Sequence, residues 1–478
     1  MQEFNDTLLS FVYQNLLETY ERFIPNRFLQ SGDVPKVSLE FKLYIQIINA
    51  YVYTLKRIEE RGQSFAIKLQ ERRLRKMLAI AKKSKWWASY FKKNNIDVGK
   101  IMTVFDLKNI PPINRPDLID IPKEDILTRQ REDNLMDWRA TSGSTTGTPF
   151  VWSQNRTTLI INMVAHFVKE LELDDFSLKR DGLRNFHMTF NFPRGAALGP
   201  FRWFSNGDLF LRSDDKNLGE KIQEISDIIT NLDGAVIQCT PSELKFLVNN
   251  LKDYNLRPPI LGFLATGQPL EENIRLFVER YLGCRVILCY GAQEIGFLAL
   301  ECKKYHGFYH TFSERVVVEI VDDKGCGVPN GTEGNITITC LDNTVMPLIR
   351  YQPGDMGALH HNMACECENK SPLLEIKGRD TDVIKFSNGG KKSAHRVLRE
   401  FAKEPFLSNV RRFQVRQDKL DEVEVLLEVR EHIAKKFIVA LEKRLSLAYS
   451  GALTIRTKQT SVIHKDGPKF KVFVPLKD

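Results

Sequence analysis

The sequence lacks long apolar runs, and its first 238 residues contain no cysteine. A membrane-spanning helix needs about 20 consecutive apolar residues, so we expect none and no membrane insertion. The N-terminus, Met1–Asp6, has no basic segment followed by an apolar stretch, which argues against a secretory signal and favours a cytoplasmic protein. All eight cysteines fall at or after Cys239. In a cytoplasmic chain this clustering favours buried thiols or a metal site over a disulfide framework.

The chain also lacks a strong excess of charge of one sign: 69 Lys and Arg stand against 60 Asp and Glu, a net charge of +9. Much of the basic surplus lies in residues 68–108. Within that segment Leu74, Met77 and Leu78 recur at helical spacing, which favours the solvated face of a helix over a nucleic-acid patch. Because no finger motif accompanies the charge, we expect no nucleic-acid partner.

With 478 residues the chain exceeds what one hydrophobic core usually supports. Apolar periodicity and turn signals divide it into 1–95, mostly helical; 96–313, alternating helices and short strands typical of α/β proteins; 314–377, β-rich and either antiparallel or barrel-like; and 381–478, a small α+β unit. We therefore predict an α/β fold with a large N-terminal domain, 1–380, and a small C-terminal domain, 381–478. In the β-rich part, strands are expected at 316–321, 335–339 and 348–350.

Residues 141–149 read Thr-Ser-Gly-Ser-Thr-Thr-Gly-Thr-Pro. Glycines allow a charged oxygen to approach the backbone, and hydroxyl and N–H groups donate hydrogen bonds to it. A surface loop rich in Ser and Thr is the alternative. No Gly-Lys-Ser/Thr follows as in a P-loop, so a lysine for phosphates has to come from elsewhere. The candidate phosphate-binding residues are Thr141, Ser142, Gly143, Ser144, Thr145, Thr146, Gly147 and Thr148.

Four later segments carry groups that suit a nucleotide site. They are Tyr290-Gly-Ala-Gln-Glu294, Arg350-Tyr-Gln-Pro-Gly-Asp355, Gly378-Arg-Asp-Thr-Asp-Val-Ile-Lys385 and Gly467-Pro-Lys-Phe-Lys471. The first follows a strand with a buried pattern, and α/β proteins bind ligands at the carboxyl ends of such strands. Each segment alone is typical of a surface turn. The prediction of a nucleotide site therefore rests on the occurrence of all of them together.

Cys302, Cys365 and Cys367, with either His306 or His310, offer four donors for a tetrahedral metal site. The alternative is that these cysteines are buried apolar residues. The residues alone leave both interpretations open.

The five motifs in this order resemble those of the adenylate-forming enzymes. Within them the chain most resembles the phenylacetate-CoA ligase family, especially its branch in capsular-polysaccharide and natural-product gene clusters, over roughly residues 70–478. The resemblance implies that a carboxylate reacts with ATP to give an acyl-adenylate, which then passes its acyl group to a thiol of CoA or of carrier-protein phosphopantetheine. An aryl or arylalkanoic acid is the expected substrate.

The resemblance also implies roles for individual residues. Lys469 is the lysine brought to the α-phosphate by a mobile C-terminal lid, with Lys471 as the alternative, and Glu294 binds Mg²⁺. The remaining nucleotide-binding residues are Thr141–Thr148, Gly267, Tyr290, Gly291, Asp355, Arg379 and Lys385. The Cys/His set becomes a structural Zn²⁺ site, with His310 ahead of His306.

Two departures from the family pattern leave questions open. The hydroxyl-rich run is one residue longer than the common form, so the hydroxyls that contact phosphate are not assigned. The hinge reads Arg-Asp-Thr-Asp at 379–382, which leaves the pivot residue open. Amide formation with an amine acceptor, a non-catalytic nucleotide-binding homologue, an acyl carrier protein as partner and the oligomeric state, a dimer included, also remain open.

Overall fold

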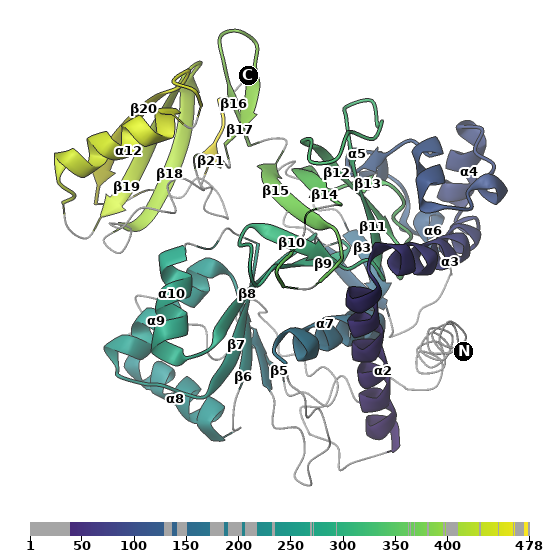
Figure 1. Cartoon of the computed structure of the whole chain (residues 1–478), viewed down its shortest axis with the longest axis horizontal. Helices are drawn as coiled ribbons and strands as arrows, with labels where there is room; N and C mark the ends of the chain where they lie inside the picture. Colours follow the sequence, from purple (N-terminus) through teal and green to yellow (C-terminus); the bar gives the residue numbers. More distant parts are fainter. Residues whose placement is uncertain are drawn as a thin grey trace.

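A computed structural model describes most of the chain from residue 39 onward (Figure 1). The described residues are 39–128, 136–140, 151–172, 186–189, 203–205, 218–231, 235–267, 270, 272–292, 294–361, 363, 365–367, 369–379, 382–394, 397, 410–429, 432–447, 449–461, 463 and 473–476. Thr141–Thr148 and Lys469 lie outside them. None of the helices in the described part is both long and apolar enough to span a bilayer.

The first described segment is helical. Its helices are α2 (Leu39–Arg61), α3 (Gln63–Ala81), α4 (Lys85–Lys93), α5 (Pro116–Ile119) and α6 (Lys123–Ile126), with 3-10 turns η2 (Val98–Lys100) and η3 (Val104–Asn109). Helix α3 is amphipathic: Leu74, Met77 and Leu78 are buried while Lys76 is exposed. Arg75 and Lys76 therefore lie on the solvent face of this helix, whereas Arg73 is buried and donates to the Glu314 carbonyl. Ser84 starts α4 by accepting a hydrogen bond from the Trp87 N–H.

Thirteen strands of the described chain join in one large sheet, in the order β1-β13-β12-β14-β15-β10-β9-β8-β7-β6-β4-β5, with β11 paired to β12. Their bounds are β1 (Ile113–Asn114), β4 (Phe186–Thr189), β5 (Trp203–Ser205), β6 (Ala235–Cys239), β7 (Ile260–Thr266), β8 (Arg285–Ala292), β9 (Gly296–Glu301), β10 (Phe308–Thr311), β11 (Val316–Val321), β12 (Gly334–Cys340), β13 (Tyr351–Gln352), β14 (Asp355–His360) and β15 (Leu373–Arg379). The separate strands β2 (Met136–Ala140) and β3 (Val151–Asn155) form an antiparallel pair.

The strands from β5 to β8 are parallel and have helices on both faces. These helices are α7 (Arg156–Glu170), α8 (Leu218–Asn231), α9 (Pro241–Asp253) and α10 (Glu272–Leu282). Along β7, Phe263 faces the core under α8–α10, whereas Leu264 packs with Phe167 of α7. Figure 1 shows α8–α10 on one side of these strands and α7 on the other. Parallel strands covered on both faces confirm the predicted α/β fold.

The strands from β9 to β15 continue the same sheet and are mostly antiparallel. The strand expected at 316–321 is β11, and the one expected at 335–339 is β12 with one more residue at each end. The barrel-like expectation for residues 314–377 is wrong in one respect. Their strands do not form a closed barrel within the described residues; β12, β13, β14 and β15 extend the large sheet, because β15 pairs with β10 at its edge.

The strand expected at 348–350 is also wrong, and Arg350 supplies the reason. Its backbone has φ 49°, in the left-handed region that β-strands do not use. Its guanidinium is buried and donates to three acceptors: Glu319 Oε2 at 3.1 Å, the Ile110 carbonyl at 2.6 Å and the Gly325 carbonyl at 2.9 Å. The segment turns at Arg350 and becomes a strand only at Tyr351.

A second, smaller core lies near the C-terminus. The hairpin β16 (Val383–Lys385) and β17 (Lys391–Ser393) precedes a sheet in the order β20-β19-β18-β21. That sheet comprises β18 (Val410–Lys419), β19 (Glu422–Val429), β20 (Thr454–Thr460) and β21 (Phe473–Val474), with α12 (Lys435–Leu447) packed on it. Figure 1 shows this sheet and α12 beside the β16–β17 hairpin.

Arg350→Ala should strongly destabilise the protein because it removes a buried charge from three buried acceptors. We expect a loss of roughly 3–5 kcal/mol in the free energy of unfolding, measured by urea denaturation followed by circular dichroism. The control is Arg456→Ala, whose side chain is 70% exposed and lies 3.3 Å from Glu422; it should cost less than about 1 kcal/mol. Equal losses in the two variants would contradict the structural role of Arg350.

Candidate functional site

Two sequence-distant segments meet where the sheet changes from parallel to antiparallel. The first is 290–294, at the end of β8, and the second is 351–355, from β13 to the start of β14. Tyr290 Oη donates to Asp355 Oδ2 at 2.8 Å, and Tyr351 Oη donates to Glu294 Oε1 at 2.5 Å. Each segment begins with a tyrosine and ends with an acid, and each tyrosine binds the acid of the other segment. These two crossed hydrogen bonds define the candidate site.

Gly291 permits the chain to turn within this site. A Cβ added at this position would lie 2.5 Å from the Gly296 carbonyl oxygen and 3.0 Å from the Phe297 Cα. These are backbone atoms of the adjoining hairpin and cannot move aside cheaply. The β8–β9 pairing also shifts register between Tyr290 and Gly291. Glycine is therefore required for β9 to lie against β8 while Tyr290 points to Asp355.

Both tyrosines act as neutral donors. Burial raises the pKa of Tyr290 well above its usual value, and the nearby Asp355 raises it further. The same two causes, burial and the facing Glu294, raise the pKa of Tyr351. The phenols therefore keep their protons at pH 7. A neutral donor organises a carboxylate without cancelling its charge.

Arg379, the last residue of β15, adds a cation at the edge of the site. Its Nε lies 3.5 Å from Asp355 Oδ1, and its side chain is 48% exposed. The two carboxylates thus differ in setting. Glu294 is buried beside a neutral phenol, which suits a divalent cation, whereas Asp355 has a partly open side that can accept from hydroxyl groups of a ligand.

The other predicted nucleotide-binding residues that the structure describes lie as follows. Gly267 directly follows β7 with φ 82°, a conformation that favours glycine. Lys385 ends β16, where its N–H and carbonyl are bound by the Gln417 amide. The hydroxyl-rich run 141–149 itself is not described, but the strands β2 and β3 that flank it are paired, with Ala140 opposite Val151.

The four predicted metal ligands lie together. The donor atoms of Cys302, His310, Cys365 and Cys367 are all within 4.8 Å of one another. Their sulfurs are 2.8 Å or more apart, too far for a disulfide bond. His306, the alternative, lies instead 3.1 Å from Glu272. The structure thus selects His310 for the group, while the metal itself stays a prediction.

The surroundings of this cluster fit a bound cation. The Cys302 sulfur accepts from the Lys304 and Tyr305 N–H groups at 3.4 Å. His310 Nδ1 lies 3.2 Å from the Ser371 carbonyl, so it carries the proton and leaves the Nε2 lone pair facing Cys367. Burial lowers the pKa of His310 to about 4. The ring is therefore neutral at pH 7, as a metal ligand must be.

The loop that carries Cys365 and Cys367 also contacts the N-terminal helices. Asn369 donates to Glu59 of α2 at 2.6 Å, and Lys370 Nζ donates to the Glu60 carbonyl at 3.0 Å. Glu59 also binds Lys169 of α7. The loop with Cys365 and Cys367, helix α2 and helix α7 are therefore joined by one group of hydrogen bonds.

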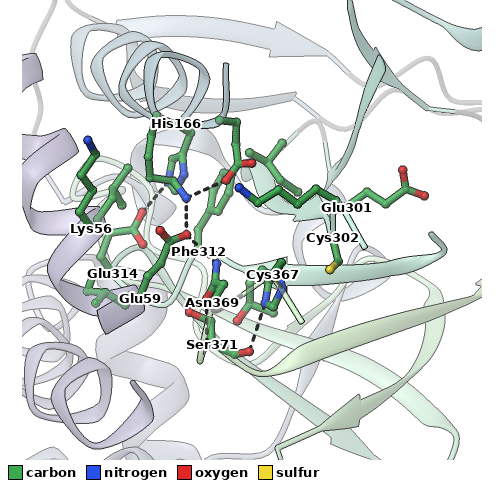
Figure 2. A pocket seen from close by; sticks show the side chains of 18 of the residues that line it. Lys56, Glu59, His166, Glu301, Cys302, Phe312, Glu314, Cys367, Asn369 and Ser371 are labelled. Carbon is green, nitrogen blue, oxygen red and sulfur yellow. Dashed lines mark hydrogen bonds and ion pairs between the residues drawn. The ribbon is translucent and has the colours of Figure 1, made fainter. Parts of the chain in front are cut away.

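Sequence reasoning missed a buried polar group next to these hydrogen bonds. His166 of α7 lies 2.8 Å from Glu314, which also accepts from Tyr51 at 2.7 Å, and the His166 ring stacks on Phe312. His166, Phe312 and Glu314 border a cavity of about 210 Å³ that extends to Cys302 (Figure 2). His166 has no motif around it, because its partner is 148 positions away. Only the three-dimensional contact identifies it.

The buried His166 should make stability depend on pH. Burial lowers the pKa of His166, so the unfolded chain takes up this proton before the folded chain as the pH falls. The free energy of unfolding should therefore decrease below about pH 6.5, by at most about 1.4 kcal/mol per pH unit from this group. His166→Gln keeps an N–H donor for Glu314 but does not titrate.

The measurement is urea unfolding of both proteins between pH 7.5 and 5. The difference in stability between wild type and His166→Gln should shrink as the pH falls. A difference that stays constant over this range would contradict a neutral, buried His166.

The chain is similar in sequence to known ligases. No protein-family profile matches the chain. A phenylacetate-coenzyme A ligase of Thermus thermophilus is 27% identical over 334 residues, which cover 66% of this chain and 71% of that protein. A phenylacetate-coenzyme A ligase of Pseudomonas putida is 25% identical over 223 residues, covering 44% of this chain and 49% of that protein.

Solved structures show the fold over most of the chain. A 2-hydroxyisobutyryl-CoA ligase in its postadenylation state aligns with 95% of this chain and 94% of its own, at a TM-score of 0.65 and 13% identity. An open conformation of that ligase with an acyl-AMP and CoA aligns with 85% of this chain and 90% of its own, at a TM-score of 0.55. The chain is thus similar in sequence to phenylacetate-coenzyme A ligases, and it shares the fold of a CoA ligase that forms an acyl-AMP.

Proposed function

We propose that the chain is an AMP-forming acid–CoA ligase. This proposal rests on the two crossed tyrosine–carboxylate hydrogen bonds between segments 290–294 and 351–355. They bring together one carboxylate suited to a divalent cation and another suited to ribose hydroxyls. A nucleotide–metal complex needs both. The sequence similarity to a phenylacetate-coenzyme A ligase and the fold shared with a CoA ligase over 95% of this chain support the same reaction.

In the proposed first step, a carboxylate oxygen of the acid attacks the α-phosphorus of ATP. The bond from that phosphorus to the bridging oxygen of pyrophosphate breaks, and pyrophosphate leaves. In the second step the CoA sulfur attacks the acyl carbonyl, loses its proton, and AMP leaves. Adenylation is needed because oxide is a poor leaving group, whereas AMP is a stable one.

The described residues have defined tasks in this proposal. Glu294 would hold Mg²⁺, which neutralises charge on the phosphates. Asp355 accepts from the ribose hydroxyls, with Arg379 beside it, and Tyr290 fixes the Asp355 carboxylate. Gly267 and Gly291 give a nucleotide close access to the backbone.

The undescribed residues complete the proposal. The run Thr141–Thr148 binds phosphate oxygens, and Lys469 approaches the α-phosphate, with Lys471 as the alternative. Residues 381–478 act as a lid that brings Lys469 to the site and excludes water from the mixed anhydride. The separate core of β18, β19 and α12 supports such independent movement. Lys385 lies where the lid begins.

The acid is proposed to be an aryl or arylalkanoic acid, since the relatives in sequence are phenylacetate-coenzyme A ligases. The thiol is proposed to be CoA, with a carrier-protein phosphopantetheine as the alternative acceptor. Loss of catalysis is less favoured, because Glu294 and Lys469 are both present. Transfer of the acyl group to an amine stays an alternative, since adenylation needs both residues whichever acceptor follows.

The Cys302–His310–Cys365–Cys367 cluster is proposed to hold a structural Zn²⁺. Three sulfurs and one nitrogen form a set that Zn²⁺ prefers, and four protein ligands leave no position for a substrate. The ion would connect the β9–β10 turn to the loop that contacts α2.

The purified protein should contain about one Zn²⁺ per chain. Cys365→Ser should lower the zinc content and the melting temperature, because one of four ligands is lost. The matched control is Cys326→Ser, since Cys326 is exposed and outside the cluster. Zinc content is measured by atomic emission. Zinc-free native protein, or equal zinc in both variants, would refute the site.

Wild-type protein should exchange labelled pyrophosphate into ATP in the presence of its carboxylic acid, tested with a panel of aryl, arylalkanoic and aliphatic acids. Lys469→Ala and Glu294→Gln should lower the exchange rate by about 100-fold or more, since each removes electrostatic stabilisation of the transferred phosphoryl group. Arg456→Ala on the exposed surface serves as the control. Absence of exchange with every acid, or normal exchange by Lys469→Ala, would overturn the proposed mechanism.

A further inference from the structure

Glu294 is a buried carboxylate, 7% exposed, and its orientation depends on the residues around it. The described hydrogen bond to its side chain comes from Tyr351 Oη, which lies 2.5 Å from Oε1. Tyr351 has no role in the nucleotide site as proposed above. We propose that Tyr351 is a positioning residue that orients Glu294 for the divalent cation that accompanies ATP. This inference rests on the proposed function and assigns Tyr351 a part in it.

The structure holds Tyr351 more firmly than a loop residue. Its backbone pairs with Ile338 of β12 on one side and with Ile113 of β1 on the other. The preceding Arg350 is fixed by its three buried acceptors. The Tyr351 ring is fully buried in the largest core cluster. The phenol oxygen therefore reaches Glu294 from the sheet, with little freedom to move away.

The direction of the hydrogen bond is also fixed. A phenol O–H is a donor and a carboxylate oxygen an acceptor, so Tyr351 donates and Glu294 Oε1 accepts. Oε1 is thereby engaged by a hydrogen bond from the phenol. A carboxylate held by one oxygen offers the other to a cation in a single orientation, which lowers the entropy lost when the cation binds.

The two tyrosine hydroxyls hold different carboxylates, so the effect of losing one can be told from the effect of losing the other. Tyr290 fixes Asp355, the carboxylate proposed for ribose, whereas Tyr351 fixes Glu294, the carboxylate proposed for Mg²⁺. Loss of the Tyr351 hydroxyl should therefore change the dependence of nucleotide binding on Mg²⁺. It should change metal-free nucleotide binding little. A residue that only supported the fold would affect both equally.

The test variant is Tyr351→Phe, which removes the hydroxyl and keeps the buried ring. Binding of the α,β-methylene analogue of ATP is measured by calorimetry over a series of Mg²⁺ concentrations. We expect the Mg²⁺ concentration for half-maximal binding to rise about tenfold, since a hydrogen bond to a charged group is lost. Binding without Mg²⁺ should match that of wild type.

Tyr281→Phe is the matched control. Its hydroxyl donates to the Leu251 and Leu256 carbonyls between α9 and α10, away from Glu294, so its Mg²⁺ dependence should equal that of wild type. A double variant gives a further check: in a Glu294→Gln background, Tyr351→Phe should add no further change. An unchanged Mg²⁺ midpoint in Tyr351→Phe, or the same shift with and without Glu294, would overturn the inference.

A second measurement does not depend on the folding of Tyr351→Phe. With 3-fluorotyrosine placed at 351, the ¹⁹F resonance should shift when Mg²⁺ is added to the analogue complex, and the same label at 281 should not. No shift at 351 would contradict the inference. Pyrophosphate exchange by wild type tests the proposed function separately, so failure of one can be told from failure of the other.

Discussion

The candidate site depends on a buried guanidinium that is not part of it. Arg350 is enclosed in the core and binds Glu319 and two carbonyls, one from Ile110 and one from Gly325. These acceptors come from three separate stretches of the chain. Their convergence holds a left-handed residue in place, and the chain then enters β13 in the orientation that directs Tyr351 at Glu294. A buried cation outside the candidate site thus helps to position the tyrosine that binds Glu294.

Much of the fold could be predicted from the sequence, because local patterns specify it. The alternation of helices and apolar strands before residue 300 predicts the α/β sheet, and Val316–Val321 is strand β11 as expected. Prediction failed where long-range contacts override local preference. Leu348 and Ile349 are apolar enough for a strand, but the position of Arg350 is decided by acceptors as many as 240 residues away.

The site shows the same limit. The motifs identify Glu294 and Asp355, and the spacing of one tyrosine and one acid in both segments is visible in the sequence. What the sequence does not show is that each tyrosine binds the acid of the other segment. Nor does it show that the loop with Cys365 and Cys367 contacts α2 through Asn369, or that His166 and Glu314 lie together beside that contact. Such pairings are properties of the packed chain.

The hydrogen bonds between segments 290–294 and 351–355 determine when the candidate site can form during folding. Its hydrogen bonds join residues 57 and 65 positions apart, and contacts of high sequence separation form late because a long loop must close first. During synthesis the parallel strands up to β8 emerge before Asp355 exists. A growing chain therefore displays Tyr290 and Glu294 without their partners, and the two segments proposed to bind the nucleotide come together only when the antiparallel half of the sheet has been added.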